Sequence, residues 1–179
     1  MSAYYEMAGT AKWCLGQPEM AVAEWLKSAE CEYVDVAGGV TPALLLYFAS
    51  IAVPAVFETK RAVKMLEGRA RDERAAVWPG AVAAYLAGLI NLDELERNYI
   101  GSDDSDTGLR EWRARFYLAS GDYSEGADRA FPLRMQESAT VTDSDFDPSS
   151  PDYLTKLWHC EFFLARSIVD ANEFGVVAG

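Results

Sequence analysis

The sequence predicts an all-α fold, and three observations lead to that class. Apolar residues recur at helical spacing along most of the chain, whereas alternation of apolar and polar residues is rare. The dipeptides Asn-Gly and Asp-Gly, which are typical of tight β-hairpins, do not occur. Glycine and proline gather between the periodic segments, at residues 16–18 and 38–42, where they are expected to separate helices.

Four helices are expected in the first part of the chain, over residues 3–15, 18–33, 41–57 and 58–70. Pro18 suits the first turn of the second helix, and Thr41-Pro42 is typical of an N-cap followed by proline. The third helix is apolar on nearly every side, so we expect other helices to surround it. The fourth is amphipathic and interleaves basic with acidic residues, which indicates an exposed, salt-bridged face.

The rest of the chain is expected to continue in antiparallel helical pairs, giving eight or nine helices in all. The expected helices cover residues 71–89, 92–99, 109–120, 123–137 and 152–172, and Pro79-Gly80 leaves open a break in the first of these. Residues 101–108 and 139–151 are polar and read as loops. With 179 residues, 50% of them hydrophobic, the chain should form one domain over 1–179 with a loose tail from about residue 174. Its core should include Leu45, Phe48, Ile51 and Leu86.

The first helical pair resembles a tetratricopeptide repeat. Tyr5 stands at the aromatic start of that pattern, Ala8-Gly9 at its Leu-Gly pair, and Ala21 with Trp25 at its A-x3-F, whereas Lys12 replaces the usual tyrosine. Residues 109–137 are similar in part, through Tyr117 and the expected turn at Gly121-Asp122-Tyr123, although Arg110 replaces the tryptophan. Gly16 and Gly121 lie 105 residues apart, close to three repeats of about 34 residues. The resemblance implies a solenoid or bundle of helical hairpins that presents a groove to a protein or peptide, without catalysis.

Membrane and secretory features are not expected. The apolar runs 43–57 and 75–90 are shorter than the roughly 18–20 residues that span a bilayer, and each contains a proline. The first residues lack the basic and apolar regions of a signal peptide. Cys14, Cys31 and Cys160 show no CxxC spacing, so we expect reduced, buried thiols and a cytoplasmic location.

Few residues suit catalysis or metal binding. His159 is the only histidine, and the adjacent Cys160 would point about 100° away on a helix, so the two do not form a Cys-His pair. The short ligand spacings of a zinc site are missing. Residues 143–147 copy the start of a calcium loop, but Pro148 and Leu154 occupy its glycine and glutamate positions, which leaves only an irregular cation site open. No enzymatic motif occurs, so we expect no cofactor and no enzyme, with a ligand-sensing or enzymatic bundle around His159 as an alternative.

Charge is the most informative feature. The formal net charge is −12, of which residues 1–90 hold −2 and residues 91–179 hold −10. This balance argues against nucleic acid and anionic membranes as partners. Acidic surface can serve solubility alone, or it can attract a basic protein. For the second case we expect the partner to contact acidic and aromatic side chains of the C-terminal half: Asp103, Asp104, Asp106, Trp112, Asp143, Asp145, Asp147 and Tyr153.

The expected function is that of a cytosolic protein-binding module that acts by occlusion. Small size, acidity and the lack of catalytic motifs resemble, in type, the immunity proteins that neutralise bacterial toxins, many of which are basic. The alternative within the same fold is an adaptor or chaperone of the tetratricopeptide type, which would hold an extended peptide in a concave groove.

Overall fold

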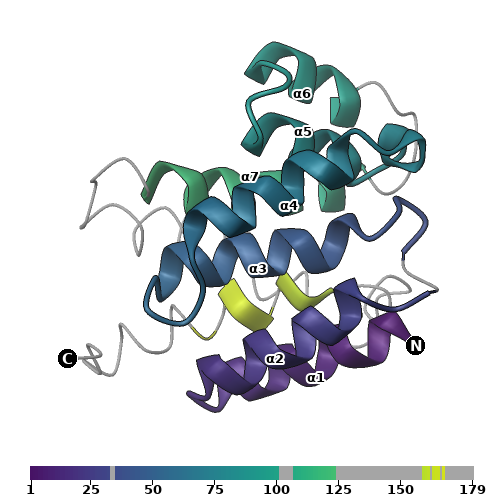
Figure 1. Ribbon diagram of the computed structural model, residues 1–179. Coiled ribbons are helices and arrows are strands. Elements are labelled where there is room, and N and C mark those ends of the chain that lie inside the picture. Colours follow the sequence, from purple (N-terminus) through teal and green to yellow (C-terminus); the bar gives the residue numbers. More distant parts are fainter. Residues whose placement is uncertain (33–34, 101–106, 124–158, 162, 166, 168–179) are drawn as a thin grey trace, which may run out of the picture.

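The computed structural model describes residues 1–32, 35–100, 107–123, 159–161, 163–165 and 167 (Figure 1). These residues contain helices and no strand, which confirms the all-α class. The elements are α1 (Ser2–Cys14), α2 (Pro18–Ala29), α3 (Val40–Ala52), α4 (Thr59–Ala70), the 3₁₀ helix η1 (Glu73–Ala76), α5 (Gly80–Leu86), α6 (Leu92–Ile100) and α7 (Thr107–Tyr123). Residues 160, 161, 163–165 and 167 are also helical, and we call them the C-terminal helical residues.

The helices pack first in chain order and then return on themselves. From α1 to α5, each α-helix packs against the next, and α6 packs against α5 (Figure 1). Helix α7 then packs against α6, α5 and α3, so that helices far apart in the sequence share one core. In a simple solenoid each repeat contacts only its neighbours. The contact between α3 and α7 departs from that pattern, so the described helices form a bundle with α3 at its centre.

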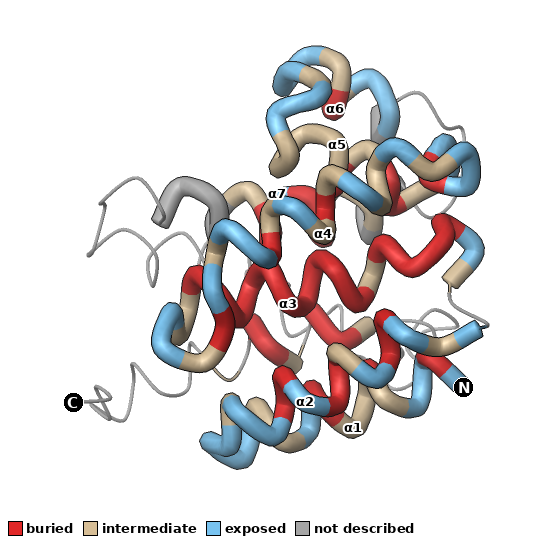
Figure 2. Tube along the Cα trace, viewed as in Figure 1, coloured by how far each residue is buried: buried red, intermediate tan, exposed pale blue. Residues whose placement is uncertain are grey.

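Helix α3 forms that centre. Residues 42–51 are all buried, and Leu44, Leu45, Leu46 and Phe48 are fully buried (Figure 2). A helix that is apolar on every side requires neighbours on every side, and α2, α4 and α7 supply them. Leu45, Phe48 and Ile51 are therefore core residues, as expected. The same expectation for Leu86 is wrong, because this last residue of the short helix α5 is only partly covered.

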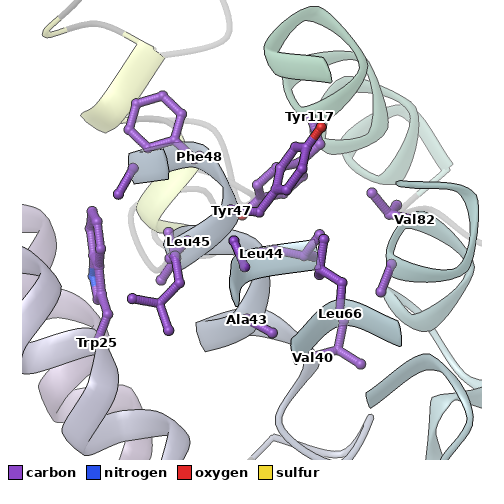
Figure 3. Packing of buried hydrophobic residues seen from close by; sticks show 14 of the residues in the cluster. Trp25, Val40, Ala43, Leu44, Leu45, Tyr47, Phe48, Leu66, Val82 and Tyr117 are labelled. Atoms are coloured by element: carbon purple, nitrogen blue, oxygen red, sulfur yellow. The ribbon is translucent and has the colours of Figure 1, made fainter. Parts of the chain in front are cut away.

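Aromatic rings connect the N-terminal hairpin to α7 through α3. Trp25 stacks on Trp13 with 5.6 Å between ring centres, and Trp13 lies 5.0 Å from Phe48. Phe48 in turn lies 5.3 Å from Phe116, which meets Tyr117 edge to face at 5.0 Å. Figure 3 shows Trp25, Phe48 and Tyr117 on three different helices, with Trp25 and Tyr117 on opposite sides of the view. Such pairs contribute about 0.5–1.5 kcal/mol each beyond the area they bury.

Both ends of α3 differ from the expectation. The residue at the N-cap is Gly39, whose φ of 87° is left-handed, and not Thr41. The Asp35 carboxylate accepts hydrogen bonds from the Gly39 and Thr41 backbone N–H groups at 2.8 and 2.7 Å, so the cap comes from the preceding loop. The helix ends at Ala52 rather than at residue 57, because Pro54 disfavours helical backbone at Val53, whose φ and ψ are −139° and 78°.

The chain between α4 and α6 breaks at Pro79-Gly80, the break that the sequence had left open. A Cβ atom at Gly80 would overlap the carbonyl group of Ala75, so only glycine permits this turn. Helix α6 begins at a reciprocal cap, in which Asn91 N–H donates to the Glu94 carboxylate and Glu94 N–H donates to the Asn91 side chain, both at 2.9 Å. None of the described helices combines the length and apolar character needed to cross a membrane.

Helix α7 runs through the turn that was expected at Gly121-Asp122. The backbone stays helical to Tyr123, so the expected end at residue 120 is wrong. A glycine inside a helix costs only about 1 kcal/mol. That cost is small compared with the burial of Phe116 and Tyr117 one turn earlier on the same helix.

Candidate functional site: a buried polar cluster and two charged surfaces

The residues expected to bind a partner lie mostly outside the described residues. These are Asp103, Asp104, Asp106, Asp143, Asp145, Asp147 and Tyr153. Trp112 is described: it is half-buried on α7 and packs against the core, with 6.3 Å between its ring centre and that of Phe116. The Asp143–Asp147 stretch, expected to hold at most an irregular cation site, and the helices expected at 123–137 and 152–172 lie largely outside as well.

A buried ion pair joins α7 to the C-terminal helical residues. Arg113 donates two hydrogen bonds to one carboxylate oxygen of Glu161, from Nε at 3.0 Å and from a terminal nitrogen at 2.6 Å. The hydroxyl of Tyr117 donates a third hydrogen bond to the same oxygen at 3.0 Å. Arg113 and Glu161 are only 8% and 1% exposed, and Tyr117 is fully buried. The charges of the pair are therefore compensated inside the protein, as burial requires.

The environment keeps this pair ionised. Burial by itself would raise the pKa of Glu161 and lower that of Arg113, because it disfavours charge. Their mutual attraction and hydrogen bonds outweigh burial, so the pKa of Glu161 is lowered and the pKa of Arg113 is raised. Burial, together with the neighbouring Glu161 carboxylate, raises the pKa of Tyr117 well above its ordinary value, so its hydroxyl remains a donor.

A second carboxylate, that of Glu6, is buried between α1 and α2. It accepts hydrogen bonds from the hydroxyls of Ser2 at 2.6 Å and Ser28 at 3.0 Å. Its backbone carbonyl accepts two more, from Thr10 at 2.9 Å and from the Trp25 indole at 3.1 Å. Burial raises the pKa of Glu6, since two hydroxyl donors compensate the charge less well than the arginine beside Glu161.

Cys160 lies close to both carboxylates. Its sulfur is 3.5 Å from Met7 Sδ on α1. Burial, and next the Glu161 carboxylate, raise the pKa of Cys160 to about 12, so the thiol is neutral and a poor nucleophile. His159 is half-buried, and its electrostatic interaction with Glu161 helps to lower the pKa of that carboxyl. The cluster thus holds the C-terminal helical residues against α1 and α7.

The cysteines differ in exposure, so the expectation that all three are buried is wrong. Cys14 is exposed near the end of α1, Cys31 is half-buried and Cys160 is buried; all are free thiols. Within the described ranges, no group of three histidine, cysteine, aspartate or glutamate residues is placed to hold a metal ion.

The basic residues of α4 and the turn after it form two groups. Arg71 pairs with Glu67 at 2.6 Å, and Arg74 pairs with Asp72 at 2.7 Å. Arg69 donates to the backbone carbonyls of Gly38 and Ala29. The others, Lys60, Arg61 and Lys64, are exposed in the first two turns of α4, and no hydrogen bond or ion pair engages them. The expected salt-bridged face is therefore present only at the C-terminal end of α4.

The buried polar cluster was not predicted from the sequence. Arg113 and Glu161 each stand among apolar neighbours on helices, which is a signal of a paired buried charge. Helical periodicity cannot say that residues 48 positions apart form the pair. Comparison with known proteins identifies no relative: no family model, no curated protein and no solved structure matches this chain.

Proposed function

We propose that the chain is a protein-binding module that acts by occlusion, namely an immunity protein that neutralises a basic toxin by covering its functional surface. The observation that carries this proposal is the charge asymmetry, with −10 of the net −12 in residues 91–179. A surface of one sign attracts a partner of the other sign and disfavours wrong partners. The cognate toxin is therefore expected to present a basic face.

The state of the buried cluster favours binding over catalysis. Glu161 is engaged by three hydrogen bonds, and the Cys160 thiol is neutral because its pKa is raised to about 12. A general base needs a pKa near the working pH, and a nucleophilic cysteine needs a lowered one. The pKa of Glu161 is lowered and that of Cys160 is raised, so neither group supports the alternative of an enzyme around His159.

The acidic stretches are close in sequence to anchored elements. Asp103, Asp104 and Asp106 directly precede α7, whose residues Arg113 and Tyr117 are fixed in the core. The other acidic stretch, residues 143–147, ends 13 positions before Cys160, the first of the C-terminal helical residues, which the buried ion pair holds. A binder whose frame is already ordered loses less conformational freedom on association. Half-buried Trp112 adds an aromatic side chain of the kind that anchors interfaces.

An adaptor of the tetratricopeptide type is the second candidate, favoured by the contact between α1 and α2. Gly9 lies directly against Trp25 and Ala21, three of the residues on which the resemblance rests. However, Cys160 contacts Met7 on α1 and Glu161 binds Arg113 on α7, so the chain's own residues already occupy part of both helix surfaces. A peptide would have to compete with the chain's own residues there, so we prefer occlusion by an outer surface.

Co-expression in bacteria tests the proposal. The tagged chain is first used to isolate its partner from the native host, and the partner is identified by mass spectrometry. The partner gene is then induced alone and together with this chain, while growth is measured. We expect a basic partner that stops growth alone and is neutralised by co-expression. A partner that is harmless, or whose toxicity is unchanged by this chain, would refute the immunity function.

A further inference from the structure

Three exposed cations lie together on α4. Lys64 follows Lys60 by four residues and Arg61 by three, so the three side chains leave the helix on neighbouring parts of one face. That face is opposite Ala62 and Leu66, which are fully buried against the core, and the exposed stretches of α4 are pale blue in Figure 2. We call Lys60, Arg61 and Lys64 the basic face of α4.

Elsewhere in the described residues, lysine and arginine side chains are engaged within the protein. Lys12 and Lys27 both bind Glu24, and Arg69 donates to the carbonyl oxygens of Ala29 and Gly38. The remaining arginines outside the basic face also have interacting groups. The basic face lacks such groups: its one polar or aromatic contact is that of the Arg61 guanidinium, 5.1 Å from the centre of the Phe57 ring.

This arrangement opposes the stability of α4. The N-terminal end of a helix carries a partial positive charge, so cations in the first turns are unfavourable. The first turn of α4 holds no acidic residue, and exposed Glu58 before it forms no ion pair with the three cations. Like charges four residues apart, as at Lys60 and Lys64, add repulsion. An external anion would relieve all of these costs.

We propose that the basic face of α4 binds an acidic segment of a protein partner, a short run of aspartate or glutamate side chains. Three cations within one to two turns can pair with two or three carboxylates. Contact with the Phe57 ring orients the Arg61 guanidinium, which can then donate two parallel hydrogen bonds to one carboxylate.

A nucleic acid fits this surface poorly. Duplex binding commonly uses about 6–10 phosphate contacts, and the basic face offers three cations. The net charge of −12 repels an extended polyanion, whereas a short acidic segment stays within the reach of the local positive potential. This surface is distinct from the acidic residues of the proposed function, so either proposal can fail without the other.

Binding of a fluorescently labelled oligoglutamate peptide to the full chain tests the proposal. Fluorescence anisotropy is measured at about 0.02 M and about 0.3 M salt, where screening differs strongly. The test variant is Lys60→Gln/Arg61→Gln/Lys64→Gln. Its matched control, Lys27→Gln/Arg71→Gln/Arg115→Gln, removes the same charge from cations that already have partners. We expect the Kd at low salt to rise about fivefold to tenfold in the test variant and less than about twofold in the control.

The midpoint of urea unfolding provides a second measurement. If the cations serve binding at the expense of stability, the test variant should unfold at a higher urea concentration than the wild type. A lower midpoint would indicate a structural role and would overturn the proposal.

Three further results would also overturn it. One is equal loss of oligoglutamate binding in the test and control variants. Another is tighter binding of a mixed-sequence DNA duplex that the test variant abolishes, which would make nucleic acid the occupant. The third is self-association of the wild type, measured by sedimentation and lost in the test variant, which would make a second copy the occupant.

Discussion

Gly9 determines how closely α1 and α2 approach each other. A Cβ atom at this position would overlap the indole ring of Trp25 and lie 3.0 Å from the Ala21 carbonyl oxygen. We therefore expect Gly9→Ala to destabilise the protein by about 1–3 kcal/mol, as overpacking of a core usually does. Urea unfolding followed by tryptophan fluorescence gives the free energy.

Gly68 on α4 is the matched control for that change. It is exposed, and nothing lies within 4 Å of a Cβ atom placed there. Gly68→Ala should therefore show only the better helix propensity of alanine, a stabilisation of about 0.5–1 kcal/mol. If Gly9→Ala stabilised the protein as Gly68→Ala does, α1 and α2 could move apart at no cost, contrary to the close contact of Gly9 with Trp25.

Glu6 makes stability depend on pH in a particular direction. Burial raises its pKa in the folded protein above the ordinary value of 4.5. The folded state then holds its proton more tightly than the unfolded state, so Glu6 lowers stability as pH rises from about 4.5 through the folded pKa. Glu6→Gln keeps an acceptor for Ser2 and Ser28 but cannot ionise. We expect its unfolding free energy to exceed that of the wild type more at pH 7 than at pH 4.

Glu32, exposed in the segment after α2, is the control for this comparison. Glu32→Gln removes the same charge from a carboxylate that is exposed in the folded protein, so at pH 7 it should change the unfolding free energy far less than Glu6→Gln does. If Glu6→Gln and the wild type differ by the same amount at both pH values, ionisation of Glu6 does not oppose folding.

Helices with strong periodicity were predictable from the sequence, and their ends were less so. The apolar character of residues 42–51 predicts a central helix, and α3 is that helix. Its start depends on hydrogen bonds from Asp35, several residues earlier, which no local pattern at Thr41 reveals. The turn expected at Gly121-Asp122 is overridden by the packing of α7 against α3 and α5. Tertiary contacts decide such boundaries, because local propensities differ by only about 1 kcal/mol.

The C-terminal helical residues depend on the ion pair between Arg113 and Glu161. Glu161→Met should destabilise the protein by about 3–5 kcal/mol, because it leaves the arginine charge buried without its partner. Arg113→Met/Tyr117→Phe/Glu161→Met removes all three polar groups together and should recover most of that loss. Urea unfolding of the single and triple variants measures both. If the losses of the single variants Arg113→Met, Tyr117→Phe and Glu161→Met add up to the loss of the triple variant, the three side chains do not act as a unit.

At the scale of the whole molecule, charge is the property that the sequence shows most directly. The count of −2 in residues 1–90 and −10 in residues 91–179 needs no structure. The structure is needed to say which charges remain available to a partner. It pairs Arg71 and Arg113 but leaves Lys60 and Lys64 unpaired. Of the residues expected to bind a partner, Trp112 is the one that lies among the described residues, on α7, and its role stays a prediction like that of the aspartates at 103–106.

Those aspartates can be tested by association kinetics with the cognate basic partner. Asp103→Asn/Asp104→Asn/Asp106→Asn should slow association severalfold or more at low salt, because steering acts on the encounter rate. The difference should shrink as salt rises past about 0.15 M, where the Debye length falls to about 8 Å. Dissociation should change little. Stopped-flow fluorescence over a range of salt concentrations measures both rates.

A control with the same change in net charge separates local steering from overall attraction. Glu19, Glu30 and Glu32 are exposed in the N-terminal half, and their triple change to glutamine also removes three negative charges. If the C-terminal half steers the partner, this control should associate nearly as fast as the wild type. Equal slowing of both variants would mean that only the net charge of −12 matters. Equal rates for the wild type and the triple asparagine variant would make the acidity of residues 103–106 a solubility feature, and the partner would then have to bind elsewhere on the helices.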